Sequence, residues 1–455
     1  MDNRRDVYAL FALVTLAAAL GNLSQTGLNA MLPAAMDEFG VAVDVGQWLT
    51  TGYMLMLGVA VPVATFLMRR LDDRGFALLG FGLFAAGSLA CWLAPEFFTE
   101  LFGRVLQAIS VGLLVPKMQE IAMTRFPQGR QATAMGVAGI ALGFAPNIGP
   151  TVGGAMDSAF GWRSFFLLLF VVSALLFVLT FPLVKRGEAD VAGSSAARFE
   201  TPSFVLSTFG FGGVLLGFSQ ASSYGFASAW VWVPVVVGAA CLVLFARRQR
   251  VIEQPLMDLR IFDSRQFSSG LLASVFLFAN FLGVTLVVPL YVQLVLGGTS
   301  LDAGLVVLPT TFTALVVNPL SGIIADKTSP RLVSLIFGAF LVVGSVASVF
   351  IDEQTPYWLL SVYQTTRAIG VSGLIGPLVT YSLAGLKGPL VPHGSSAIVV
   401  VRQVSGTFGT ALMVFCVTAV SGFVGAEAAL PYQVAFGFSA VMALASAAVI
   451  VARVR

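Results

Sequence analysis

Long apolar runs follow one another along the whole chain, with short polar segments between them. A helix that crosses a bilayer needs about 20 consecutive apolar residues, and fourteen runs of roughly that length can be delimited. They cover residues 7–32, 48–68, 76–94, 98–123, 132–156, 164–184, 204–222, 230–246, 267–295, 303–325, 332–351, 357–384, 395–422 and 432–452. The pattern predicts an all-α polytopic membrane protein with fourteen transmembrane helices.

Composition rules out a large soluble enzyme. Of the 455 residues, 57% are hydrophobic and 10% are charged, whereas a soluble domain carries about 25% charged residues. The three cysteines lie in apolar runs without the spacing of a metal site, and no Gly-x-x-x-x-Gly-Lys-Ser/Thr nucleotide loop occurs. The single histidine, His393, is expected in a loop. We therefore expect no enzyme, no cofactor, no metal and no nucleic-acid partner.

The basic residues indicate how the chain is oriented. With both termini placed in the cytoplasm, 20 of the 25 lysines and arginines fall in cytoplasmic segments, and Arg163 alone falls outside. The remaining four lie within spans. Positively charged loops are retained in the cytoplasm, so this distribution predicts an even number of spans with both termini cytoplasmic.

The two ends of the chain resemble each other at an offset of 256 to 261 residues. The segments that match are 33 with 289, 62–74 with 319–331, 87–88 with 344–345, and 112–116 with 373–377. Four matches in the same order predict two parallel six-helix bundles, at residues 1–186 and 265–455. Residues 187–264 then form a linker and a two-helix insertion. Parallel repeats are typical of secondary transporters with a site between the halves, near the middle of the membrane.

Seven motifs, in order, resemble those of one transporter family. They are LNAMLP (28–33), QWLTTGYML (47–55), GRVLQAISVGLLVP (103–116), GFAPNIGPTVGG (143–154), WRSFF (162–166), PLMDLRIF (255–262) and RQVSGTFGTAL (402–412). With these motifs the chain resembles, over essentially its whole length, the major facilitator superfamily. Within that superfamily it is similar to the 14-helix drug:proton antiporters of the lincomycin-resistance type. The resemblance implies a major facilitator fold with its helices arranged as 6+2+6, in the bacterial cytoplasmic membrane. It also implies a central cavity lined by spans 1, 4, 9 and 12.

The fifth span carries the motif that the family associates with antiport. Its small residues and prolines are Gly136, Ala145, Pro146, Gly149, Pro150, Gly153 and Gly154. Small residues four apart let two helices approach closely, and each proline removes a backbone donor and bends the helix. The resemblance implies that this helix packs onto the other half near the outer gate and controls opening. Ordinary tight packing is the alternative.

Two loops resemble the family's cytoplasmic gate. Gly322, Asp326, Lys327 and Arg331 match its pattern in the second half, and Asp73 with Arg74 matches it less completely in the first. A carboxylate at a helix end can latch a neighbouring helix. A solvated, positively charged loop is the alternative for both.

Few charges are expected within spans, where each costs about 2.5–3.5 kcal/mol. They are Arg104, Lys117, Glu120, Arg367 and Arg402. Glu120 is the only carboxylate expected there, since Glu100, at the outer end of the run 98–123, is counted with the acids of the outer loop. Lys117 and Glu120 are three residues apart and can pair on one helix face. The proton-coupling candidates are Arg104, Glu120 and Asp157.

The first span departs from the family pattern. Ser24 and Gln25 stand where the family usually has a carboxylate. The residues expected to line the substrate cavity are Asn22, Ser24, Gln25, Asn29, Gln107, Arg367 and Arg402; hydrogen bonding between helices is the alternative for the polar set on span 1. Four basic residues against one acid predict that a cationic cargo is disfavoured and that an anionic, zwitterionic or neutral amphiphile fits better.

Together these features predict a monomeric, proton-coupled antiporter that exports amphipathic drugs or related small molecules by alternating access. One alternative is a dedicated exporter or uniporter of an anionic or zwitterionic metabolite or lipid. Another, of a different class, is a non-transporting membrane receptor or assembly factor.

Overall fold

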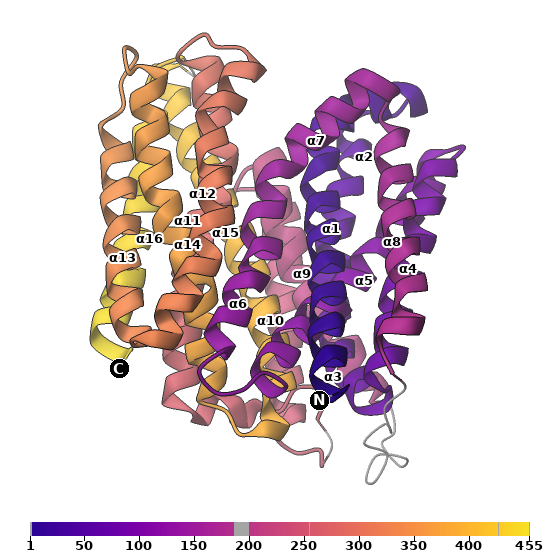
Figure 1. Cartoon of the computed structure of the whole chain (residues 1–455). Coiled ribbons are helices and arrows are strands. Elements are labelled where there is room, and N and C mark those ends of the chain that lie inside the picture. The colour runs from indigo at the N-terminus through magenta and orange to yellow at the C-terminus, as the bar shows by residue number, and fades with distance from the viewer. Residues whose placement is uncertain (1, 186–199, 254, 426, 455) are drawn as a thin grey trace.

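The computed structural model describes residues 2–185, 200–253, 255–425 and 427–454, and every regular element in them is a helix (Figure 1). The predicted domain boundary at residue 186, and Arg186 and Arg198 of the basic set, lie outside the described residues.

Helices of membrane length account for each of the fourteen predicted spans. The first six spans are α1 (Asp2–Phe39), α3 (Trp48–Arg70), α4 (Asp73–Leu93), α5 (Phe97–Thr124), the composite of α6 (Gln131–Gly139), η1 (Ile140–Phe144) and α7 (Ala145–Phe160), and α8 (Arg163–Leu183). The next two are α9 (Thr201–Tyr224) and α10 (Ala229–Gln249). The last six are α11 (Arg265–Leu294), α12 (Ser300–Lys327), α13 (Pro330–Ala347), α14 (Tyr357–Ala384), α15 (Val391–Val424) and α16 (Leu430–Arg453). The connecting helices are α2 (Val43–Gly46), η3 (Leu259–Asp263), η4 (Ser348–Phe350) and η5 (Gly388–Leu390).

Thirteen of these units, within the described residues, are long and apolar enough to cross a membrane. The fourteenth, α14, has 28 residues but more polar ones, among them Gln364, Thr366 and Arg367. It lies inside the second half, where Gln364 and Arg367 are buried. The expectation of fourteen spans is therefore confirmed by length, and α14 can carry polar residues because neighbouring helices shield it from lipid.

Two sequence expectations about helix limits are wrong. Glu100, placed in an outer loop, is fully buried in the first turns of α5. His393, also placed in a loop, is buried in the first turn of α15, which begins at Val391. Both residues lie next to polar or small residues that resemble loop sequence, but the burial of their side chains against other helices decides their place.

The fifth span bends in its middle. A π-helical stretch, η1, joins α6 to α7, and Pro146 and Pro150 follow directly after it. Neither proline can donate a backbone hydrogen bond, and π-helical turns and prolines are common causes of sharp bends. The bend lets α6 pack on α12 of the second half while α7 packs on α1 of the first half.

The two halves stand side by side, with both chain ends at one side of the molecule, here called the terminal side (Figure 1). The inserted helix α9 contacts both halves. Ser219 on α9 shares a 3.0 Å hydrogen bond with Thr51 on α3, and the Phe218 ring packs edge-on against Phe408 of α15 with 5.0 Å between ring centres. The insertion therefore covers one seam between the halves.

Candidate substrate cavity and gate

A cavity of ≈ 440 Å³ lies between the halves. Its walls come from α1, α3, α5, α7, α9, α11 and α15, with η1 contributing Leu142. The expectation that spans 1, 4, 9 and 12 line it is therefore partly wrong. Spans 1, 4 and 9 are present as α1, α5 and α11, but α15 replaces α14, and α3 and α9 add to the wall. The lateral contact of α9 with both halves explains why the insertion reaches the cavity.

The polar wall comes chiefly from α1 and α15. On α1, Asn22, Gln25, Thr26 and Asn29 line the cavity, and α15 adds Arg402, Gln403, Thr407 and Thr410. Pro146 and Pro150 of the antiporter motif also belong to the lining. Ser24 and Gln107 were expected in the wall, but both side chains are fully buried between helices and neither belongs to the lining. Both accept hydrogen bonds from Arg104 instead.

Arg104 is fully buried and ties three helices together. Its Nη1 donates to the hydroxyl of Ser24 at 2.7 Å, to the carbonyl of Ser24 at 3.1 Å and to Gln107 Oε1 at 3.0 Å. Its Nε donates to the carbonyl of Leu49 at 3.3 Å, and its guanidinium lies 4.3 Å from the centre of the Tyr53 ring. Arg104 thus joins α5 to α1 and α3, behind the cavity wall.

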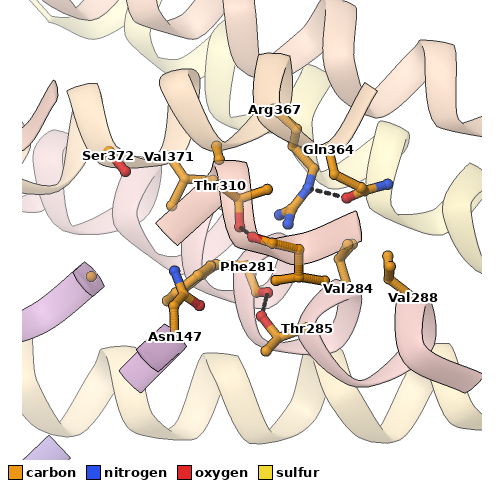
Figure 2. Close-up of a pocket in the computed structure, with 13 residues that line it drawn as sticks. Asn147, Phe281, Val284, Thr285, Val288, Thr310, Gln364, Arg367, Val371 and Ser372 are labelled. Atoms are coloured by element: carbon orange, nitrogen blue, oxygen red, sulfur yellow. Dashed lines mark hydrogen bonds between the residues drawn. The ribbon is translucent and has the colours of Figure 1, made fainter. Parts of the chain in front are cut away.

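Arg367 occupies a similar position in the second half. It lines a separate small pocket of ≈ 20 Å³ with Asn147, Thr285 and Thr310 (Figure 2). Its Nε donates to Gln364 Oε1 at 3.1 Å and its Nη1 donates to Asn280 Oδ1 at 3.1 Å. Asn280, which the sequence did not single out, therefore holds this arginine in place.

Arg402 is the only charged residue among the described residues that line the large cavity. Its guanidinium lies 3.8 Å from the centre of the Phe278 ring, and its Nη1 has no hydrogen-bond partner among the described residues. A positive charge that is stacked on an aromatic ring but incompletely hydrogen-bonded can still bind an anionic group. The cavity is accordingly mostly apolar, with amide and hydroxyl groups chiefly on α1 and α15 and one cation, Arg402, on α15.

Glu120 belongs to a charge cluster that does not reach the cavity. Lys117 Nζ lies 2.8 Å from Glu120 and 2.7 Å from Asp73, and Arg125 lies 3.1 Å from Asp73. The expected Lys117–Glu120 pair is confirmed, with Asp73 as a third member. Asp73 therefore pairs within the first half, whereas the neighbouring Arg74 stacks on the Phe181 ring at 4.9 Å.

Asp326 makes a contact that crosses between the halves. Its carboxylate accepts hydrogen bonds from the backbone N–H groups of Ala132 at 3.0 Å and Thr133 at 2.7 Å, and from the Thr133 hydroxyl at 2.6 Å. These donors are the first residues of α6, where the helix dipole favours an anion. Lys327 and Arg331 are exposed.

Two further hydrogen bonds join α3 to α15 on the terminal side. The hydroxyls of Thr65 and Ser396 are 2.8 Å apart, and Arg69 Nη2 lies 2.7 Å from His393 Nε2. Together with Asp326 they hold the halves together at this side of the molecule.

The glycines of the fifth span serve two different contacts. A Cβ on Gly136 would lie 2.5 Å from the Asn318 carbonyl oxygen of α12, and a Cβ on Gly322 would meet the Ala132 carbonyl, so this pair allows the halves to touch. Gly149 and Gly153, by contrast, pack on Thr26 and Gly27 of α1. The expectation that this part of the motif packs onto the other half is wrong for this conformation, because the bend at η1 turns α7 towards α1.

Three remaining motif residues lie outside these contacts. Gly154 makes only ordinary contact, since an added Cβ would lie 3.9 Å from Ala30, and Ala145 is buried beside η1. Asp157 is half-buried near the end of α7 and is not part of the cavity wall.

The PLMDLRIF motif forms the attachment of the insertion to the second half. Arg260 donates to both carboxylate oxygens of Asp258, with Nη2 at 2.6 Å from Oδ2, and this bonding holds the pKa of Asp258 below its usual range. The Asp258 backbone N–H donates to His393 Nδ1 at 3.1 Å. His393 thus joins the linker to the terminal-side contact with Arg69. Within the described residues no group of three or more His, Cys, Asp or Glu side chains is placed to hold a metal ion.

Comparison with known proteins agrees with this architecture. Residues 14–410 match the family model of the Major Facilitator Superfamily. The lincomycin resistance protein LmrB of Listeria monocytogenes is 33% identical over 416 residues, which cover 90% of this chain and 86% of that protein. The methylenomycin A resistance protein of Streptomyces coelicolor is 29% identical over 90% of this chain and 86% of that protein.

Solved structures show the same fold at low sequence identity. The proton:xylose symporter XylE superposes with a TM-score of 0.67 at 13% identity, covering 98% of this chain and 95% of that one. The chain is a multi-pass membrane protein and belongs to the major facilitator superfamily.

Proposed function

We propose that this chain is a proton-coupled antiporter that exports amphipathic small molecules by alternating access. The observation that carries the proposal is the cavity between the halves, which combines an apolar wall with hydrogen-bonding groups chiefly on α1 and α15 and the cation Arg402. Sites for drug-sized ligands are concave and mostly apolar, with a few placed polar groups. Several relatives are named for resistance to lincomycin or methylenomycin A, which favours export as the direction.

The terminal side is proposed to face the cytoplasm, since most of the basic residues flank the helix ends there. In this orientation the Asp326 contacts close the cytoplasmic side. The structure then represents a state that is shut towards the cytoplasm. The close approach of Gly136 and Gly322 must separate when the transporter opens to the inside. Each chain holds its own cavity between its own two halves, so the proposed working unit is a monomer.

The cavity is proposed to prefer anionic, zwitterionic or neutral amphiphiles. Arg402 has no carboxylate opposite it among the described lining residues, and unit charges about 4 Å apart interact by about 4 kcal/mol at the effective dielectric of a partly buried site. A monovalent cation would meet this repulsion without a counter-ion. Arg367, which donates to Gln364 and Asn280, is proposed to contribute less to the choice.

Flux in proteoliposomes tests the function. Purified protein is reconstituted, and uptake of the anionic amphiphile taurocholate and of lincomycin is measured with and without an acidic lumen. We expect uptake that the imposed pH gradient accelerates and that protein-free liposomes lack. Two results would contradict proton-coupled export. One is uptake of both compounds at the same rate in protein-free liposomes, and the other is an uptake rate that is the same with and without the pH gradient.

A further inference from the structure

Glu100 is a buried carboxylate without a partner. It lies one turn after the start of α5 and is 0% exposed. Within the described residues neither of its carboxylate oxygens has a hydrogen-bond partner. Buried polar groups in proteins are nearly always hydrogen-bonded, and an ionised carboxylate in such a place is very costly. The group therefore calls for an explanation other than packing.

The groups near Glu100 and its neighbour Arg104 come from four helices. Arg104 follows four residues later on the same helix face, and its Nη2 also has no hydrogen-bond partner among the described residues. Cys91 on α4 donates through its thiol to the Glu100 carbonyl at 3.7 Å. Tyr53 on α3 stacks on Arg104. At the start of α8, Arg163 is already engaged by Glu38 of α1 at 2.8 Å and by the Ala94 carbonyl at 2.6 Å.

Arg104 connects this carboxylate to the substrate cavity. Its hydrogen bonds to Ser24 and to the Leu49 carbonyl hold α1 and α3, and the neighbours of Ser24 on α1, Gln25 and Asn22, line the cavity. A negative charge on Glu100 would attract the free Nη2 of Arg104 and weaken its hold on α1. Removal of that charge would restore the arrangement seen here. The state of one carboxyl group can thereby change the shape of the cavity wall.

We propose that Glu100 is the carboxylate that binds and releases the transported proton. The inference rests on the proposed proton-coupled export. In the conformation described, the carboxyl group holds a proton taken from water on the outer side. When the halves open to the cytoplasm, Arg104 pairs with the carboxylate and the proton leaves to cytoplasmic water. This places the proton site on α5, in a chain whose first span has Ser24 and Gln25 in place of an acid.

The other two candidate acids are less suited to this step. Glu120 is held by Lys117 at 2.8 Å and by the Thr124 hydroxyl at 2.8 Å, away from the cavity. Asp157 is half-buried near the end of α7 and is not among the residues that line the cavity. Of the three acids, Glu100 alone combines full burial with a neighbour that holds a wall helix.

Glu100→Gln tests the proposal against the matched control Glu96→Gln, which removes an exposed carboxylate one turn earlier. Proteoliposomes with an acidic lumen and a clamped membrane potential are incubated with labelled taurocholate in the external buffer, and its accumulation in the lumen is measured. A gradient of about one pH unit supports about tenfold accumulation when one proton is exchanged. We expect E100Q to lose this accumulation while it still exchanges labelled for unlabelled taurocholate without a gradient, and E96Q to behave as the wild type. Gradient-driven accumulation by E100Q at the wild-type level would overturn the proposal.

Infrared spectroscopy of the purified protein provides a readout that does not depend on transport. We expect the wild type to show a protonated carboxyl stretch that titrates with pH and is missing in E100Q. A spectrum in which E100Q retains every titrating carboxyl band of the wild type would refute the proton site.

If the wild type moves no taurocholate, the proposed function fails, but the infrared result still decides the role of Glu100. If E100Q does not fold, Glu100→Asp is recorded instead; a shifted band supports the site and an unshifted band counts against it.

Discussion

The carboxylate of Asp326 holds Thr133 by two hydrogen bonds, one from the backbone N–H at 2.7 Å and one from the hydroxyl at 2.6 Å. Asp326 lies in the last turn of α12 of the second half, and Thr133 lies in the first turn of α6 of the first half. The negative charge caps the positive end of the α6 dipole. This side chain thus contributes to closing the terminal side by satisfying donors that any helix N-terminus leaves free.

Replacing Asp326 should impair the transport cycle more than replacing Asp72. Hydrogen bonds to a charged group contribute about 1.5–3 kcal/mol, so Asp326→Asn should shift the equilibrium towards inward opening by about tenfold or more. Asp72 caps α4 through the Gly75 N–H inside the first half, and asparagine is an equally good cap. Taurocholate flux at matched expression measures both variants. An equal loss of flux in the two variants would show that the Asp326 contact does not hold the two halves together during the cycle.

Side chains at Gly149 and Gly153 should block transport although the protein still inserts. A Cβ at Gly149 would collide with the Thr26 hydroxyl, and one at Gly153 with the Gly27 carbonyl. Gly149→Leu and Gly153→Leu should therefore push α7 away from α1 and abolish flux, and alanine at either position should reduce it. Gly154→Ala is the control, because its Cβ has room beside Ala30. Wild-type flux in both leucine variants would contradict the claim that transport requires the close contact of α7 with α1.

The charge preference of the cavity should depend on Arg402. We expect tetraphenylborate to compete with bound taurocholate at least about tenfold better than tetraphenylphosphonium, a cation of similar size, given the repulsion estimated for one buried charge. Arg402→Gln should remove the difference, and Arg367→Gln should reduce it less, because Arg367 lies in the separate small pocket. Equilibrium competition on purified protein measures the three proteins. A preference for the cation that persists in both variants would contradict the proposed cargo class.

The number of membrane helices was predictable because it depends on the length of apolar runs, which is visible residue by residue. The family was predictable because seven motifs in order resemble it. The pairing of Lys117 with Glu120 followed in the same way, since three residues along a helix bring two side chains to one face.

The distribution of the arginines between cavity and helix contacts was not predictable. Arg104 and Arg402 both lie within apolar spans, yet one is enclosed by Ser24 and Gln107 and the other faces the cavity. The rotation of each helix about its axis decides the difference, and it depends on packing partners that are distant in the sequence. The prolines and the π-helical stretch that turn α7 onto α1 act in the same indirect way.

The burial of Glu100, near the start of α5, was not predictable from the sequence for the same reason. An acid at the fourth position of a helix resembles part of a polar loop, and only its burial in the folded chain distinguishes it. The i, i+4 spacing from Arg104 was the available signal, and it becomes informative once the helix is known to begin at Phe97.

Alternating access is tested most directly by two distances measured together. Spin labels replace Arg130 and Lys327 on the terminal side in one variant, and Ser158 and Gly304 on the opposite side in another, all of them exposed positions. The free cysteines Cys91, Cys241 and Cys416 are first changed to serine. Double electron–electron resonance then follows both pairs in liposomes as the pH is lowered and taurocholate is added. We expect the terminal pair to separate under the conditions in which the opposite pair approaches. Two distances that stay constant, or that lengthen together, would contradict it.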